Sequence, residues 1–299
     1  MSASSNGRGL WILCKKKFRF RGIRDCRQIY GESIEKICEI AGITRDAYYK
    51  HWKREKVKEE REAQILEKVH DIRQEQPRLG TKKLHVMIQE DVKIGRDRLH
   101  AVLNENGMMV KRRKKYTRTT YSNHEYAVAP NLVKELIVTR PDQVWVGDIT
   151  YLETKDRHAY LFLVTDKYSR KIVGYKLGDS LEHRHAIDAL REAVKSKRGE
   201  GETIFHSDRG CQYCCHEYRK VLRQHGIKSS MTDENHCYQN GVAERVNGIL
   251  KDEYYLDIRF NSFEEAERTV KQAIELYNIR RPHRSLNMAT PMVVYNMAA

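Results

Sequence analysis

The sequence lacks any long apolar run. No stretch of its 299 residues approaches the roughly 18 apolar residues that a membrane-spanning helix requires. The apolar run at 10–14 is short, and Lys15, Lys16 and Lys17 follow it. A secretory signal carries its basic residues first, so this order argues against one. We therefore expect no membrane association and a cytoplasmic location.

Cysteine is also sparse. The seven cysteines are an odd number and lack the spacing of a disulfide framework, so we expect reduced thiols. One cluster invites comparison with zinc sites, because Cys-x-x-Cys is half of a structural ligand set. Its members are Cys211, Cys214, Cys215, His216, His236 and Cys237. A second ligand pair at conventional spacing is missing, so we assign no zinc site.

Nearly all of the excess positive charge belongs to the first half of the chain. Residues 1–140 contain 32 Lys and Arg against 18 Asp and Glu, whereas 141–299 contain 24 against 23. A solubilising surface is the ordinary explanation of a charge run, but the basic runs at 15–27 and 111–115 lie beside helical patterns. We infer a module that binds a polyanion, most obviously nucleic acid, joined to a near-neutral half that carries out chemistry.

Residues 31–56 have the pattern of a helix-turn-helix. A short amphipathic helix is followed by Gly42 and then by Thr44, which can cap a second helix. The start of the second helix is the part of this motif that meets DNA. We predict DNA contacts at Arg45 and Tyr48, and a plain helical hairpin is the alternative.

Residues 57–115 are predicted to form a second, helical and winged-helix-like DNA-binding region. A charged helix extends to 76, Gly80 and Gly95 open two short helices, and 108–110 resemble a strand leading into a basic wing. The predicted DNA contacts here are Arg96, Arg98, Lys111, Arg112, Arg113, Lys114 and Lys115.

The remaining segments complete the predicted organisation. The basic segment 1–30 is expected to be disordered, and 116–140 to be a linker because it lacks a strong period. Beyond it, strands are expected at 143–153, 160–166, 171–176, 203–207 and 228–231, and helices at 181–197, 213–225, 241–254 and 262–277. This order predicts that 141–299 form an α/β domain with a mixed sheet flanked by helices.

Three acidic residues lie in distinct contexts: Asp148 in Trp-Val-Gly-Asp-Ile-Thr-Tyr, Asp208 in His-Ser-Asp-Arg-Gly-Cys-Gln-Tyr and Glu244 in Asn-Gly-Val-Ala-Glu-Arg-Val-Asn. Their predicted places are within a strand, at a strand end and in the first turns of a helix, and active sites of open α/β sheets gather at strand ends. Phosphodiester chemistry uses two divalent cations about 3.5 to 4 Å apart, and hard cations take oxygen ligands. The three carboxylates therefore predict a metal site.

These motifs together resemble one family. Asp208 and Glu244 are separated by 35 residues, and Lys251 follows Glu244 by two helical turns. The chain resembles insertion-sequence transposases in three segments, 145–152, 206–213 and 240–251. It also resembles them in the short C-terminal motifs Tyr-Asn, Arg-Pro-His, Ser-Leu and Thr-Pro of 277–291. The specific likeness is to the OrfB type of the third insertion-sequence family, with its retroviral-integrase-like DDE core. The helix-turn-helix region and 78–100 are similar too, so the likeness extends from about residue 30.

The resemblance implies an RNase H-like core at 141–299, with a C-terminal helical tail, that cleaves DNA at insertion-sequence ends and transfers the strands. Asp148, Asp208 and Glu244 would be catalytic and bind two Mg²⁺ ions, with Mn²⁺ as an expected substitute, and Lys251 would contact DNA. Implied partners are the terminal inverted repeats, target DNA, further copies of the chain on DNA, and an upstream OrfA product or frameshift fusion. A bacterial, nucleoid-associated location follows.

Two other functions share some of these features. A regulator that binds DNA without catalysis, including a domesticated transposase, is disfavoured by the complete triad. An RNase H-like nuclease acting on RNA–DNA hybrids would not explain two N-terminal DNA-binding units. Gln239 stands where the family commonly has an acidic residue, which affects a loop contact and leaves the triad intact.

Overall fold

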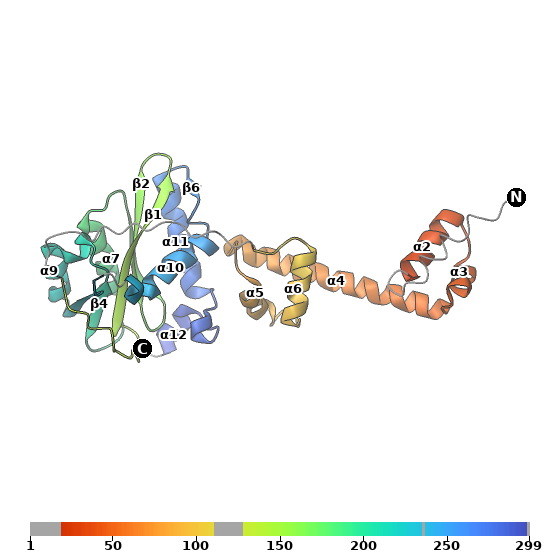
Figure 1. Cartoon of the computed structure of the whole chain (residues 1–299), viewed down its shortest axis with the longest axis horizontal. Coiled ribbons are helices and arrows are strands. Elements are labelled where there is room, and N and C mark those ends of the chain that lie inside the picture. The colour runs from red at the N-terminus through yellow and green to blue at the C-terminus, as the bar shows by residue number, and fades with distance from the viewer. Residues whose placement is uncertain (1–18, 111–127, 235–236, 298–299) are drawn as a thin grey trace. The chain divides into compact units, whose positions relative to one another are not determined.

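A computed structural model describes residues 19–110, 128–234 and 237–297 (Figure 1). The chain divides into two compact units between Lys68 and Val69. Within the described ranges, no helix combines the length and apolar character needed to cross a membrane. The domain limits expected from the sequence remain a prediction.

The first unit contains α2 (Arg19–Tyr30), α3 (Ile34–Ala41) and the first part of α4 (Arg45–Glu75). Ser33 caps α3 through its side chain, and Gly42 ends the helix with a positive φ of 65°, a conformation that glycine adopts without strain. Helix, glycine turn and second helix follow one another as the helix-turn-helix pattern predicted.

The packing of this unit corrects three expectations. Residues 19–30 are helical rather than disordered, because Ile23 is fully buried in the small apolar core. Tyr48 belongs to the same core with only 5% exposure, so its predicted contact with DNA is wrong. The predicted helix from 57 is not separate, because no Gly or Pro interrupts α4 between Arg45 and Glu75.

The second unit begins with the end of α4, followed by α5 (Thr81–Ile88) and α6 (Arg96–Glu105). Gly80 and Gly95 precede these helices, as predicted. The predicted strand at 108–110 is wrong, since these residues are irregular; the Met108 carbonyl instead accepts a hydrogen bond from Arg73 Nη1 at 2.7 Å. The predicted wing at 111–115 and the contacts assigned to it lie outside the described residues.

A mixed sheet forms the centre of this unit. Its path has the order β3-β2-β1-β4-β5, and short β6 pairs with β1. The strands are β1 (Val144–Thr154), β2 (His158–Asp166), β3 (Ile172–Gly178), β4 (Thr203–Ser207), β5 (Ile227–Met231) and β6 (Arg259–Phe260). β1, β2 and β3 are antiparallel neighbours, whereas β4 and β5 run parallel to β1. This topology confirms the predicted RNase H-like fold.

Helices cover both faces of the sheet (Figure 1). One apolar layer joins the sheet to α7 (His183–Ser196), α8 (Cys211–Cys214) and α9 (His216–Gln224). The other joins it to α10 (Gly241–Glu253) and α11 (Phe263–Ile279). Alternate residues of β2 enter opposite layers, as the two-residue period of a strand requires.

Two details of the layers differ from the sequence pattern. The helix expected at 213–225 is two helices, because Cys215 has extended backbone between α8 and α9. The C-terminal α12 (Pro291–Met297) anchors near the start of β1, where the Tyr295 hydroxyl donates to the buried Asp142 carboxylate at 2.8 Å.

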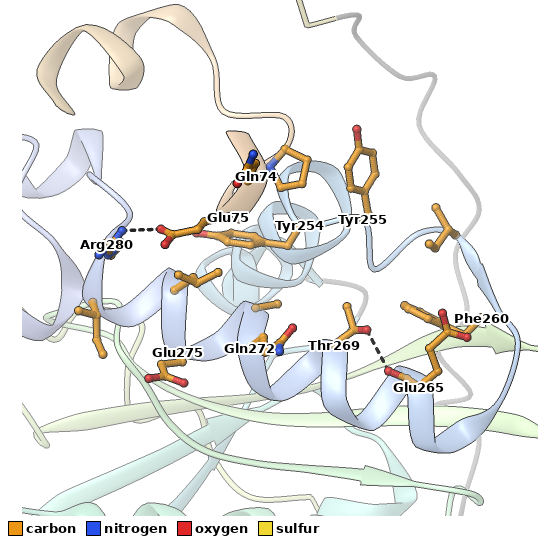
Figure 2. A pocket seen from close by; sticks show the side chains of 15 residues that line it. Gln74, Glu75, Tyr254, Tyr255, Phe260, Glu265, Thr269, Gln272, Glu275 and Arg280 are labelled. Atoms are coloured by element: carbon orange, nitrogen blue, oxygen red, sulfur yellow. Dashed lines mark hydrogen bonds and ion pairs between the residues drawn. The ribbon is translucent and has the colours of Figure 1, made fainter. Parts of the chain in front are cut away.

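The end of α4 is joined to the layer formed by α10 and α11. A pocket of about 660 Å³ separates it from α11, and Figure 2 shows the Tyr254 and Tyr255 rings among its lining. Across the pocket Arg280 Nη1 pairs with Glu75 at 2.5 Å. Arg78 donates to Asp257 nearby, at 3.1 Å, so α5 starts from a defined position.

Candidate active site

Asp148 lies in the middle of β1, the central strand of the sheet. It is partly buried and stands opposite Leu163 of β2. One carboxylate oxygen accepts from the Ile149 backbone N–H at 2.9 Å. The other accepts from Asn247 Nδ2 at 2.7 Å, which connects the strand to α10.

The register of β4 brings Asp208 to the same level. Val144 pairs with Ile204 and Val146 with His206, so the difference in residue number between partners is constant. Two residues further along both segments, the same difference places residue 208 beside residue 148. Asp208 follows the last residue of β4, and its Oδ1 accepts from the Gly210 backbone N–H at 3.1 Å. Parallel pairing therefore aligns the two aspartates.

Glu244 reaches the site on the first turn of α10, and its side chain is exposed. Asn240, just before this helix, donates from Nδ2 to the Gly147 carbonyl at 2.9 Å. Because Gly147 immediately precedes Asp148, this bond fixes the start of the helix against the part of β1 that carries Asp148. α10 packs on β1 along the same side.

One face of α10 is directed at Asp148. Asn247 lies one turn after Glu244 and bonds directly to the aspartate, and Lys251 lies one further turn along. Burial lowers the pKa of Lys251, and the neighbouring Asp148 charge opposes that effect. Asn247 was not predicted from the sequence, although its spacing of three from Glu244 places it on the predicted face.

The electrostatics of the site centre on Asp148. Its pKa is raised to about 7, mainly by burial and next by the nearby Asp208 carboxylate. The hydrogen bond from Asn247 acts in the opposite direction, and Glu244 adds a smaller repulsion. The three carboxylates thus repel one another electrostatically, and bound cations would relieve this repulsion.

Gly147 has a steric role beside the site. A Cβ at this position would stand 2.4 Å from the Phe205 ring of β4, so a side chain would force the two strands apart. Tyr213 packs on the same ring, with the centroids 5.7 Å apart. Burial raises the pKa of Tyr213, and Asp208 and Asp148 add to the effect, so the phenol stays protonated.

The residues fit a site for hard divalent cations. The donors are carboxylate oxygens, and the buried Oδ1 of Asn247 has no hydrogen-bond partner among the described residues. The carboxylate oxygens of Asp148, Asp208 and Glu244 do not all approach within 4.8 Å of one another.

The other predicted contacts lie elsewhere. Arg45, in the first unit, is exposed and pairs with Glu35 at 3.7 Å. In the second unit, Arg96 and Arg98 are exposed on α6, where Arg96 pairs with Asp97 at 2.8 Å. Their roles in DNA binding remain predictions.

The Arg-Pro-His motif is structural. Arg281 is 2% exposed and pairs with both oxygens of Glu253, at 2.8 and 2.9 Å. His283 contacts the Tyr277 hydroxyl at 3.2 Å, and burial lowers its pKa to about 3, which keeps it neutral. His206 is likewise buried, and its Nδ1 lies 2.9 Å from Ser230 Oγ.

Among the described residues near the cysteine cluster, one group could supply metal ligands. Atoms of His183, Cys215 and Glu217 lie within 4.8 Å of one another. Both Cys215 and His183 lie at helix N-termini, whose dipoles disfavour a cation. We assign no metal to this group.

Comparisons with known proteins agree with this geometry. Two family models, each described as an integrase core domain, match residues 138–237 and 225–291. The insertion element IS600 uncharacterized 31 kDa protein of Shigella sonnei is 35% identical over 273 residues, which cover 85% of this chain and 96% of that protein. The InsF transposase of insertion sequence IS3A from Escherichia coli K12 is 34% identical over 179 residues. That match covers 59% of this chain and 62% of InsF, less than two thirds of its length.

Among solved structures, the HTLV-2 integrase catalytic core in complex with magnesium is 19% identical with a TM-score of 0.42. The alignment covers 52% of this chain and 97% of that one. The family follows from the sequence matches, and the two matched ranges span residues 148, 208 and 244. The chain belongs to the IS3-type insertion-sequence transposases, DDE polynucleotidyl transferases with an integrase-type core.

Proposed function

We propose that Asp148, Asp208 and Glu244 are the catalytic metal ligands with which this transposase cleaves and transfers DNA strands at the ends of an insertion sequence. One observation carries the proposal. The β1–β4 register aligns the aspartates, and the bond from Asn247 to Asp148 turns the Glu244-bearing face of α10 toward them.

The proposed cofactor is a pair of Mg²⁺ ions, with Mn²⁺ as a substitute. When bound, such ions supply positive charge for ionising the attacking hydroxyl and for stabilising the leaving oxygen. Asp148, held at both oxygens, gives a fixed ligand, whereas exposed Glu244 can adjust as substrate enters. Lys251 places a cation beside Asp148, where it can also attract a phosphate.

One site suffices for both reactions. Water as nucleophile gives cleavage, and a 3′-hydroxyl gives strand transfer, with in-line displacement in each case. No covalent intermediate between protein and DNA is required. A catalytically silent regulator is the disfavoured alternative, because the three carboxylates and their supporting asparagines are all in place.

The proposed partners follow from this chemistry. They are DNA, as terminal inverted repeats and target, further copies of the chain assembled on that DNA, and an upstream OrfA product or frameshift fusion. The proposed location is the bacterial cytoplasm, in association with the nucleoid. Arg45, Arg96, Arg98, Lys251 and the run 111–115 are the proposed DNA contacts.

Neutral isosteres test the proposal. Asp148→Asn, Asp208→Asn and Glu244→Gln should each abolish joining of a labelled terminal-repeat oligonucleotide to a plasmid in Mg²⁺, while DNA affinity in EDTA stays near that of the wild type. Asp252→Asn, an exposed carboxylate on the same helix, is the matched control and should remain active. Full joining activity in any triad variant would refute the assignment.

A further inference from the structure

A basic pocket lies on the side of α10 that faces away from Asp148. It has a volume of about 680 Å³ and is formed by the start of α5, by α10 and by the loop after α11. Arg245 and Ile249 of α10 line it. They lie on a different face of the helix from Glu244, Asn247 and Lys251. Five of its ten lining residues are basic and none is acidic: Lys82, Lys83, Arg245, Arg281 and Arg284.

Two of these cations already have a partner. Glu253 Oε1 accepts from Lys83 at 2.5 Å, and Arg281 binds the same carboxylate through two nitrogens. This buried group joins α5, α10 and the C-terminal loop, so it holds the pocket in shape. Glu253 is therefore not available to neutralise the remaining cations.

The other three cations are available to a ligand. Lys82, Arg245 and Arg284 are exposed, and none has a carboxylate within 4 Å among the described residues. Their positive field extends into the pocket. The pKa of Lys83 falls to about 8, first through burial and then through the Arg281 and Arg245 charges.

Helix termini extend this surface toward α6. Gly80 precedes α5 without a side-chain cap, so first-turn N–H groups remain open to an anion. A neighbouring pocket of about 500 Å³ shares Thr81 and Lys82 and is completed by Arg96, Asp97 and His100 of α6, with Arg96 paired to Asp97. The two pockets therefore adjoin at Lys82, whose cation faces both.

We propose that this surface binds successive backbone phosphates of duplex DNA and sets the position of the duplex relative to Glu244. The assignment rests on the proposed function, because it takes DNA as the substrate. Cations spread over two adjoining pockets suit a row of phosphates better than one small anion. Phosphate contacts fix position without reading sequence, so the surface should act on any duplex.

The salt dependence of binding tests the proposal. The probe is a fluorescent mixed-sequence duplex of about 30 base pairs, titrated in EDTA between about 50 and 200 mM NaCl. Each lost phosphate contact reduces the magnitude of the negative slope of log K against log salt by about 0.9, so Lys82→Gln/Arg245→Gln/Arg284→Gln should make the slope less negative by nearly three. Arg223→Gln is the control, since Arg223 is an exposed arginine on α9, across the sheet. A slope unchanged in the triple variant would overturn the proposal.

Further measurements distinguish a loss of DNA contacts from unfolding, from binding of free anions and from an error in the triad assignment. The triple variant should keep its thermal unfolding midpoint, because its three side chains are exposed, and its joining activity should recover at low salt. If inorganic phosphate at constant ionic strength erased the difference from wild type, the pocket would hold free anions rather than DNA. Glu244→Gln should bind with the wild-type slope; full joining by that variant would refute the triad and leave the slope result standing.

Discussion

Asp148 carries an electrostatic cost that the metal-free protein cannot avoid. Its folded pKa of about 7 lies above the unfolded value of about 3.9. The folded state therefore holds an extra proton between these values, and the contribution of this group to stability falls as pH rises through that range. Above pH 7 the ionised carboxylate remains repelled by Asp208 until cations bind.

Proton and metal should compete at this carboxylate. We predict that Mg²⁺ affinity, measured by titration calorimetry, rises by up to about tenfold per pH unit below the Asp148 pKa and levels off above it. Asp148→Asn should bind Mg²⁺ weakly and without this pH dependence. The same pH profile in wild type and variant would show that another group controls binding.

Gly147 is the second constrained residue. Gly147→Ala should destabilise the protein by about 1–3 kcal/mol in denaturant unfolding, because its Cβ would overlap the Phe205 ring. Gly248→Ala is the matched control, since a Cβ there meets nothing within 4 Å in the interior of α10. The control should gain up to about 1 kcal/mol. Equal effects at both positions would exclude a steric cause.

At the scale of elements, three segments are joined by one carboxylate. Glu253 ends α10, Lys83 belongs to α5 and Arg281 follows α11. Removing one member of a buried ion group leaves uncompensated charge, which costs more than the group contributes as a whole. This explains why the Arg-Pro-His motif supports the fold rather than the chemistry.

Glu253→Gln should therefore lower the free energy of unfolding by about 3–5 kcal/mol, measured in urea. Glu275→Gln, an exposed carboxylate on α11, should change it by less than about 0.5 kcal/mol. A small effect at Glu253 would mean that the helices are held by apolar packing alone.

The sequence specified local elements better than their junctions. Alternation in β1 and the turn at Gly42 depend on neighbouring residues, so they were predicted closely. The burial of Tyr48 depends on its packing against Ile23 and Ile37 and could not be read from its own neighbours. The unbroken α4 could have been read, because the sequence between Arg45 and Glu75 has no Gly or Pro. In the site, motif context gave the carboxylates, but the bond from Asn247 to Asp148 required the packing of α10 on β1.

At the scale of the whole molecule, the apolar cores are separate. Ile23, Ile37 and Tyr48 belong to a cluster confined to residues before Lys68. The layers on the two faces of the sheet consist of residues after Val69. Since apolar burial is the main source of stability, each of these clusters stabilises the unit that contains it.

Calorimetry of the full chain should consequently show two unfolding transitions rather than one. Ile37→Ala leaves a cavity in the first unit and costs about 2–5 kcal/mol, so it should lower one midpoint only. Leu190→Ala, a fully buried residue of α7, should lower the other midpoint by the same mechanism. If either substitution shifted both midpoints together, the units would fold as one, and α4 would have to transmit that cooperativity because it is the helix that crosses the division.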